Sequence, residues 1–91
     1  MGKVPIPYGE SVVGRSEGKD KIVINEGSIS KKHARLKVTK AGVWITDLGS
    51  KNGTKINGSD MLIESGKEVA IDESMVINFA DVQCHIELNK V

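Results

Sequence analysis

The segment Ser28-Ile29-Ser30-Lys31-Lys32-His33, residues 28–33, is the part of the sequence that decides the fold. It is a short polar loop between two runs with the composition of strands, and it carries hydroxyl and ammonium groups. Gly14-Arg15 ends an earlier strand, and a second polar loop at residues 50–54 follows a later one. If these loops meet at one end of a β-domain, they present a guanidinium, a hydroxyl, an ammonium and an amide. Such donors, with no acid–base pair beside them, suit an anionic ligand that is bound and released unchanged.

Hydrophobic alternation outside the loops predicts an all-β domain. Ala34, Leu36 and Val38 alternate with polar residues, which is the pattern of a half-buried strand. Pro5 and Pro7 exclude a central strand near the N-terminus. We predict strands over residues 10–13, 22–24, 33–39, 43–48, 54–57, 67–71, 75–79 and 82–89. Short strands with turn signals every eight to twelve residues are typical of an antiparallel sandwich or barrel.

The composition indicates one small domain over residues 1–91 and excludes several classes of function. The net charge of +1 gives weak attraction to nucleic acid, so we expect no direct nucleic-acid partner and a local anion site. The single cysteine, Cys84, forms no intrachain disulfide and indicates a reducing, intracellular compartment. We expect no membrane segment and no signal peptide. The abrupt ends suggest a domain cut from a longer protein.

Three motifs in a fixed order resemble the forkhead-associated (FHA) family. They are Gly14-Arg15, the pattern Ser-x-x-His at residues 30–33, and Asn52-Gly53, which follows Asp47-Leu48-Gly49-Ser50-Lys51. The resemblance covers essentially the whole chain. It implies an antiparallel β-sandwich of the FHA type that binds phosphothreonine peptides, with no enzymatic activity and no cofactor.

The resemblance assigns a role to most of the predicted phosphopeptide-binding residues. Arg15 would bind phosphate oxygens through its guanidinium, and Ser30 would donate its hydroxyl to the phosphate. Lys31 would add a further contact to the phosphate, and Asn52 would bond the main chain of the ligand. Lys51 is included in the site, although family members often carry a small polar residue there, so its role is open.

Three further motif residues are expected to be structural rather than ligand-binding. In the family the histidine ring ties its loop to the neighbouring strand, so His33 is not a catalytic base. Gly14 and Gly53 would permit a close approach of the backbone and positive φ. The chain has no catalytic residues and no metal site by this interpretation, because His33, His85 and Cys84 are too few ligands for zinc.

A finer resemblance concerns the segments 11–15, 28–34 and 79–84, which look like the FHA domains of mediator of DNA damage checkpoint proteins, including insect counterparts. It implies a nuclear protein that acts in DNA damage signalling and forms a homodimer through this domain. The regular last strand would offer an edge for direct packing of two copies. The alternative function is a structural homodimerisation domain with little or no phosphopeptide binding. A phosphotransferase or hydrolase is a third interpretation, which lacks a base or metal site.

Overall fold

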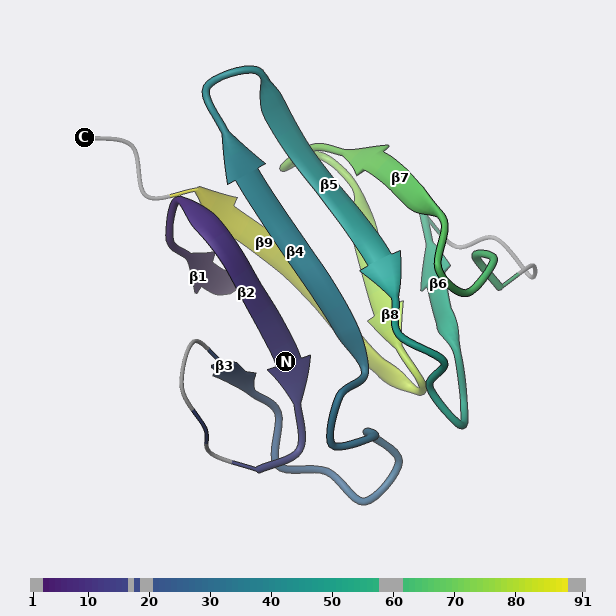
Figure 1. Ribbon diagram of the computed structural model, residues 1–91. Coiled ribbons are helices and arrows are strands. Elements are labelled where there is room, and N and C mark those ends of the chain that lie inside the picture. Colours follow the sequence, from purple (N-terminus) through teal and green to yellow (C-terminus); the bar gives the residue numbers. More distant parts are fainter. Residues whose placement is uncertain (1–2, 17, 19–20, 58–61, 89–91) are drawn as a thin grey trace.

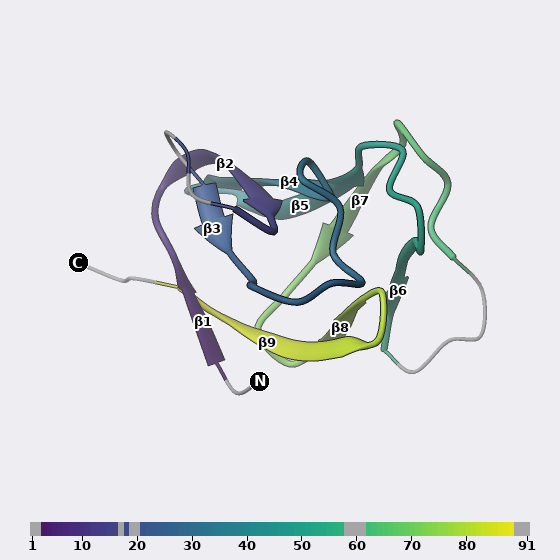
Figure 2. The same cartoon turned by 90° about the horizontal axis from the view of Figure 1, so that it is seen from below.

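The computed structural model describes residues 3–16, 18, 21–57 and 62–88, in which all regular structure is β-strand (Figure 1). The strands form two sheets that pack face to face, so the predicted all-β sandwich is confirmed (Figure 2). The first sheet has the order β1 (Lys3–Ile6), β9 (Val82–Leu88), β8 (Val76–Phe79), β6 (Thr54–Ile56). The second has the order β3 (Lys21–Val23), β2 (Gly9–Gly14), β4 (Ala34–Thr39), β5 (Gly42–Asp47), β7 (Glu68–Ile71).

The core lies between the two sheets and follows the predicted alternation. In β4 the inward residues Ala34, Leu36 and Val38 are buried, and the residues between them are only partly covered. Burying each larger aliphatic or aromatic side chain contributes about 1.5–3 kcal/mol, so this layer is the main stabilising term. The core comprises Ile6, Val13, Ile24, Ile29, Ala34, Leu36, Val38, Val43, Ile45, Ile71, Ile77, Phe79, Cys84 and Ile86.

Two edge pairings are parallel, although the other pairings of adjacent strands are antiparallel. β3 lies beside β2, and β1 lies beside β9. Pro5 stands in β1 at the edge of its sheet, where a strand tolerates a residue without an N–H. The last strand is therefore not an edge, since β9 lies between β1 and β8. The expectation of an exposed terminal strand is wrong for this reason.

The dipeptide Asn57-Gly58 at the end of β6 is typical of a hairpin turn, but β6 forms no hairpin with β7. Asn57 has a φ of 58°, and β6 pairs with β8 rather than with the next strand. The following strand, β7, belongs to the other sheet, and Gly58 lies outside the described residues. The chain therefore crosses from one sheet to the other here instead of forming a hairpin.

The connections that contain the sequence motifs gather at one end of the sandwich. β2, β5 and β8 end there, and β4, β6 and β9 begin there, as the register of their pairings requires. In Figure 1 this is the lower end, and Figure 2 is viewed from that side. We call it the loop end; it consists of residues 28–33, 47–54 and 80–81. In the described residues no helix is long and apolar enough to span a membrane.

Candidate functional site

Two of the loops at the loop end, residues 28–33 and 47–54, carry sequence motifs, and we call them the first and second motif loops. His33 joins these two motif loops from inside the protein. Its ring is fully buried and meets the Phe79 ring edge-on, with 5.9 Å between centroids. Nδ1 accepts a hydrogen bond from the Ser30 N–H at 3.2 Å, so the neutral ring carries its proton on Nε2 and donates to the Gly53 carbonyl at 2.8 Å. Both ring nitrogens are used within the protein. His33 therefore positions the loops and does not face a ligand.

Ser30 is held so that its hydroxyl can serve an anion. The backbone N–H of Lys51 donates to Ser30 Oγ at 3.0 Å, across 21 residues of sequence. A hydroxyl accepts through its lone pairs and donates through its hydrogen, so this bond fixes the oxygen while leaving the O–H as a donor. Ser30 is only partly buried. The geometry is that of a preorganised donor at the surface.

Asn52 ties the same two loops at a second point. Its Nδ2 donates to the carbonyl of Ser28 at 2.8 Å, and its side-chain oxygen remains an acceptor. The predicted role was a bond to the main chain of the ligand, and the oxygen is the atom through which Asn52 would make it. Asn52 is exposed, as such a role requires.

The cationic residues of the predicted site lie at the same end of the sandwich. Arg15 follows the last residue of β2 and is partly buried, whereas Lys31, Lys32 and Lys51 are exposed. Because Lys51 is bonded through its N–H to Ser30, its backbone is fixed beside the Ser30 hydroxyl. These cationic residues thus share one end of the sandwich with the Ser30 hydroxyl.

The second motif loop is organised by the buried carboxylate of Asp47. Its oxygens accept bonds from Gly49 N at 3.0 Å, from Ser50 N at 3.1 Å and Ser50 Oγ at 2.6 Å, and from Thr54 Oγ1 at 2.8 Å. Burial raises the pKa of Asp47, but the hydrogen bonds from Ser50, Thr54 and Gly49 outweigh it and hold the pKa below its ordinary value. The ionised carboxylate therefore keeps the loop in one conformation.

The two motif glycines, Gly14 and Gly53, differ in backbone conformation. Gly53 has a φ of 81°, which favours glycine, and a Cβ at this position would also displace the exposed Leu62 side chain. Gly14 is the last residue of β2 and has no positive φ, so the expectation of positive φ is wrong for it. Its carbonyl accepts the N–H of Ile24 at 2.9 Å, which continues the pairing of β2 with the β3 segment.

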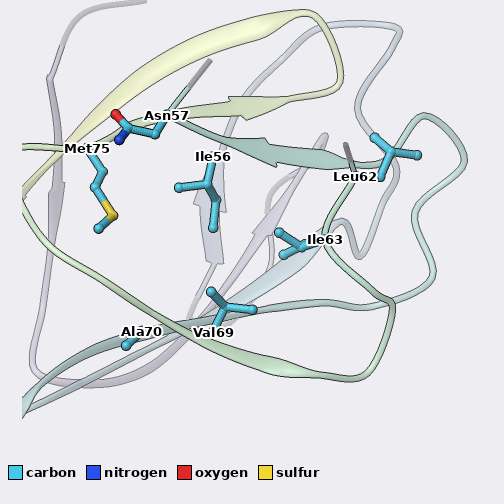
Figure 3. A pocket seen from close by; sticks show the side chains of 7 residues that line it. All are labelled: Ile56, Asn57, Leu62, Ile63, Val69, Ala70 and Met75. Atoms are coloured by element: carbon cyan, nitrogen blue, oxygen red, sulfur yellow. The ribbon is translucent and has the colours of Figure 1, made fainter. Parts of the chain in front are cut away.

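Two hollows lie near these loops and differ in chemistry. One, of about 390 Å³, is lined mainly by apolar side chains from β6, β7 and their flanking segments: Ile56, Asn57, Leu62, Ile63, Val69, Ala70 and Met75 (Figure 3). The other, of about 560 Å³, is polar and is lined by Ser28, Asn52, Lys55, Asn78, Ala80 and Asp81. Only the polar hollow shares residues with the two motif loops.

Sequence reasoning missed the contribution of Asp47 and Asp81 to this site. The signal for Asp47 was present, because an Asp two residues before Gly-Ser is typical of a carboxylate that caps its own turn. No signal indicated that Ser28 Oγ donates to Asp81 Oδ1 at 2.5 Å, since 53 residues separate them. Cys84 and His85, considered as metal ligands, fall on opposite faces of β9, and burial raises the pKa of the Cys84 thiol.

Comparison with known proteins agrees with this geometry. The family model for the FHA domain matches residues 11–80. The FHA-2 domain of a Mycobacterium tuberculosis ABC transporter is 31% identical, over 86% of this chain and 67% of that chain, with a TM-score of 0.65. EmbR of Mycobacterium tuberculosis, in complex with a low-affinity phosphopeptide, is 27% identical over 82% of this chain and 18% of that chain, with a TM-score of 0.70.

A third solved structure shows the same fold at lower identity. It comes from a structural and functional analysis of phosphothreonine-dependent FHA domain interactions and is 20% identical, over 84% of this chain and 73% of that chain, with a TM-score of 0.69. Comparison with curated protein sequences gives no match.

Proposed function

Because the chain belongs to the FHA domain family, we propose that it is a non-enzymatic module that binds phosphothreonine-containing segments of partner proteins. The observation that carries the proposal is the interlocked loop end. His33, Lys51 and Asn52 bond across the two motif loops, which holds Ser30 among cationic residues. The phosphopeptide complex of EmbR and the phosphothreonine-dependent interactions of a second relative support the same ligand class.

The phosphate would be bound by three kinds of donor. Arg15 supplies a guanidinium, Ser30 a hydroxyl already fixed by the Lys51 N–H, and Lys31 an ammonium. Phosphothreonine carries roughly −1.5 to −2 charges at neutral pH. Each hydrogen bond to a charged group contributes about 1.5–3 kcal/mol, and the ordering of a flexible peptide offsets part of the total. The balance gives roughly micromolar binding, or about −8 kcal/mol.

Lys51 and Asn52 would act on the peptide rather than only on the phosphate. The Asn52 side-chain oxygen is the acceptor for a peptide N–H, which would fix the direction of the bound chain. Lys51 is exposed and its backbone lies beside Ser30, so its ammonium adds a positive charge that would attract an anionic peptide to the site. The burial of His33 and its bonds within the fold support a site that binds a peptide without changing it chemically.

The proposal is tested by Arg15→Ala against a matched control, Arg35→Ala. Arg35 lies on the outer face of β4, where it pairs with Glu10 at 3.4 Å, and Glu10 is four residues before Gly14 in β2. An oriented phosphothreonine peptide library supplies ligands, and fluorescence anisotropy measures Kd for the best peptides and their unphosphorylated forms. We expect Arg15→Ala to weaken binding by about a hundredfold and Arg35→Ala to leave it unchanged. Both variants should keep the β-sheet circular dichroism. Unchanged affinity in Arg15→Ala would remove Arg15 from the site.

Two finer roles belong to the proposal as well: nuclear DNA damage signalling and homodimerisation. They rest on the segments 11–15, 28–34 and 79–84 and not on the fold. A tagged protein should then accumulate at induced DNA breaks, and Arg15→Ala should abolish that accumulation. Because β1 covers one edge of β9, a dimer would use the outward residues of β9, Gln83, His85 and Glu87, rather than its edge. Light scattering at micromolar concentration should give twice the monomer mass, and a monomeric mass would exclude the structural-dimer alternative.

A further inference from the structure

The polar hollow is continuous with the candidate phosphate site. Its lining includes Ser28 from the first motif loop and Asn52 from the second, and these two residues are bonded to each other at 2.8 Å. The rest of the lining comes from β6, β8 and the turn at residues 80–81. A peptide that bonds Ser30 and Asn52 therefore passes the mouth of the hollow. The volume of about 560 Å³ is sufficient for a long side chain.

Asp81 is held in a defined position at this hollow. The turn before it contains Ala80 at a φ of 57°, a conformation that is uncommon outside glycine and asparagine. The Ala80 N–H donates to the Gly53 carbonyl at 2.9 Å, which is the same oxygen that accepts from His33. The Ser28 hydroxyl then donates to Asp81 Oδ1 at 2.5 Å. The first motif loop thus bonds the Asp81 carboxylate, the second bonds the backbone of the preceding residue, and the other carboxylate oxygen remains an acceptor.

We propose that Asp81 is a specificity-determining residue, which selects phosphothreonine peptides with a basic side chain at the position that enters the hollow and disfavours an acidic one there. This inference rests on the proposed function of the site. A bound phosphothreonine adds roughly −1.5 to −2 charges close to the Asp81 carboxylate. A cationic side chain between the phosphate and Asp81 offsets the repulsion on both sides, whereas an acidic one adds to it.

Among the described residues that line the hollow, Lys55 is the other charged one, and it lies further along the sheet than Asp81. Lys55 is in β6 and pairs across the sheet with Asn78, whereas the pair Thr54 and Phe79 lies nearer the loop end. Asp81 lies beyond Phe79, in the turn at the loop end itself. Along the sheet, the backbone of Asp81 therefore lies nearer the loop end than the backbone of Lys55 does.

The test uses an oriented phosphothreonine library on the whole domain, followed by a pair of synthetic peptides. The pair differs only at the position with the strongest charge preference, which carries Arg in one peptide and Glu in the other. Each favourable or unfavourable pair of exposed charges changes affinity by up to about fivefold, so we expect the Arg peptide to bind about tenfold more tightly. Asp81→Asn keeps the acceptor for Ser28. It should reduce the ratio of the two dissociation constants, Glu peptide over Arg peptide, to about two or less. Asp81→Lys should invert it.

Asp72→Asn is the matched control. Asp72 is also an exposed turn aspartate bonded to a serine hydroxyl, but it lies at the opposite end of the sandwich, after β7. The Asp72→Asn variant should leave the ratio of dissociation constants at about ten, because the charge of Asp72 is remote from the loop end. A wild-type domain without a charge preference, or a preference that Asp81→Asn does not reduce, would overturn this inference alone. Failure of the wild type to bind any phosphothreonine peptide would instead overturn the proposed function, and this inference with it.

Discussion

At the loop end, several side chains bond to groups far away in the sequence, whereas the side chains of two turns at the opposite end bond within their own turn. His33, Ser30 and Asn52 make bonds across 20, 21 and 24 residues, and Ser28 reaches Asp81 across 53. At the opposite end the Ala41 N–H bonds Thr39 Oγ1 and the Ser74 N–H bonds Asp72 Oδ1, each across two residues.

This difference separates a surface that must keep its shape from turns that only reverse the chain. A local turn closes whether or not the rest of the fold is present, so it gains little from tertiary structure. The bonds of the loop end form only in the complete sandwich. Because these bonds hold the loops, the hydrogen-bond donors are positioned before a ligand binds. Such preorganisation lowers the entropy cost of binding. The loop end should therefore be sensitive to single substitutions in both stability and affinity, and the opposite end should be tolerant.

Replacing His33 by alanine should give the largest effect. It empties a fully buried site beside Phe79 and removes the partner of the Ser30 N–H. We expect the free energy of unfolding to fall by about 3 kcal/mol, from the cavity and the unpaired group together. Urea denaturation measures it, with His85→Ala on the outer part of β9 as the control. A His33→Ala protein of normal stability that fails to bind phosphopeptide would make His33 a ligand contact instead.

Replacing Asp47 by alanine should come second. The change leaves the N–H groups of Gly49 and Ser50 and the hydroxyl of Thr54 without their acceptor. We expect a loss of about 2 kcal/mol, and a weaker phosphopeptide affinity because the 47–54 loop carries Lys51 and Asn52. Chemical denaturation and anisotropy on the same samples measure both. If stability falls while affinity stays constant in the folded protein, the loop does not need Asp47 for its binding conformation.

Acidification should lower the free energy of unfolding by a smaller amount, through protonation of the same Asp47 carboxylate. The folded-state pKa of Asp47 lies below its ordinary value of 3.8, so the unfolded chain takes up the proton at higher pH than the folded one. The stability that this carboxylate contributes is complete above pH 3.8 and is lost as the pH falls through the folded-state pKa. The wild type should therefore lose more stability between pH 6 and about pH 3 than Asp47→Asn does. Parallel curves for the two proteins would contradict the assignment.

Replacing Asp72 by alanine should give the smallest effect. Its bonds to the N–H and hydroxyl of Ser74 are local, and the turn is exposed. We expect Tm to change by about 1 °C or less, because the groups that lose their partner are hydrated instead. Thermal melts of Asp72→Ala and Asp47→Ala measure the Tm of each variant. They compare an exposed turn aspartate, Asp72, with a buried one, Asp47. Similar losses in the two variants would remove the distinction between the ends of the sandwich.

The sequence predicted the parts of this protein that depend on local pattern. Alternation located the strands and the buried faces, as β4 shows, because side-chain direction in a strand depends only on position. The ordered motifs led to the loops that meet at the loop end. The parallel pairing of β1 with β9 was not predictable, since a segment with Pro5 resembles an irregular terminus and its partner is some 80 residues away. The Ser28–Asp81 bond was missed for the same reason, because nothing in either segment indicates the other.

The parallel pairing of β1 with β9 also has a mechanical consequence. Lys3 lies opposite His85 and Ile6 lies opposite Leu88, so the chain enters at one end of the pair and leaves at the other. Tension between Lys3 and Leu88 acts along the two strands in opposite directions, and it loads the hydrogen bonds of the whole pair in shear rather than breaking them one at a time. A pulling force between Lys3 and Leu88 is therefore carried by the hydrogen bonds between β1 and β9, whereas the loops at residues 28–33 and 47–54 connect other strands.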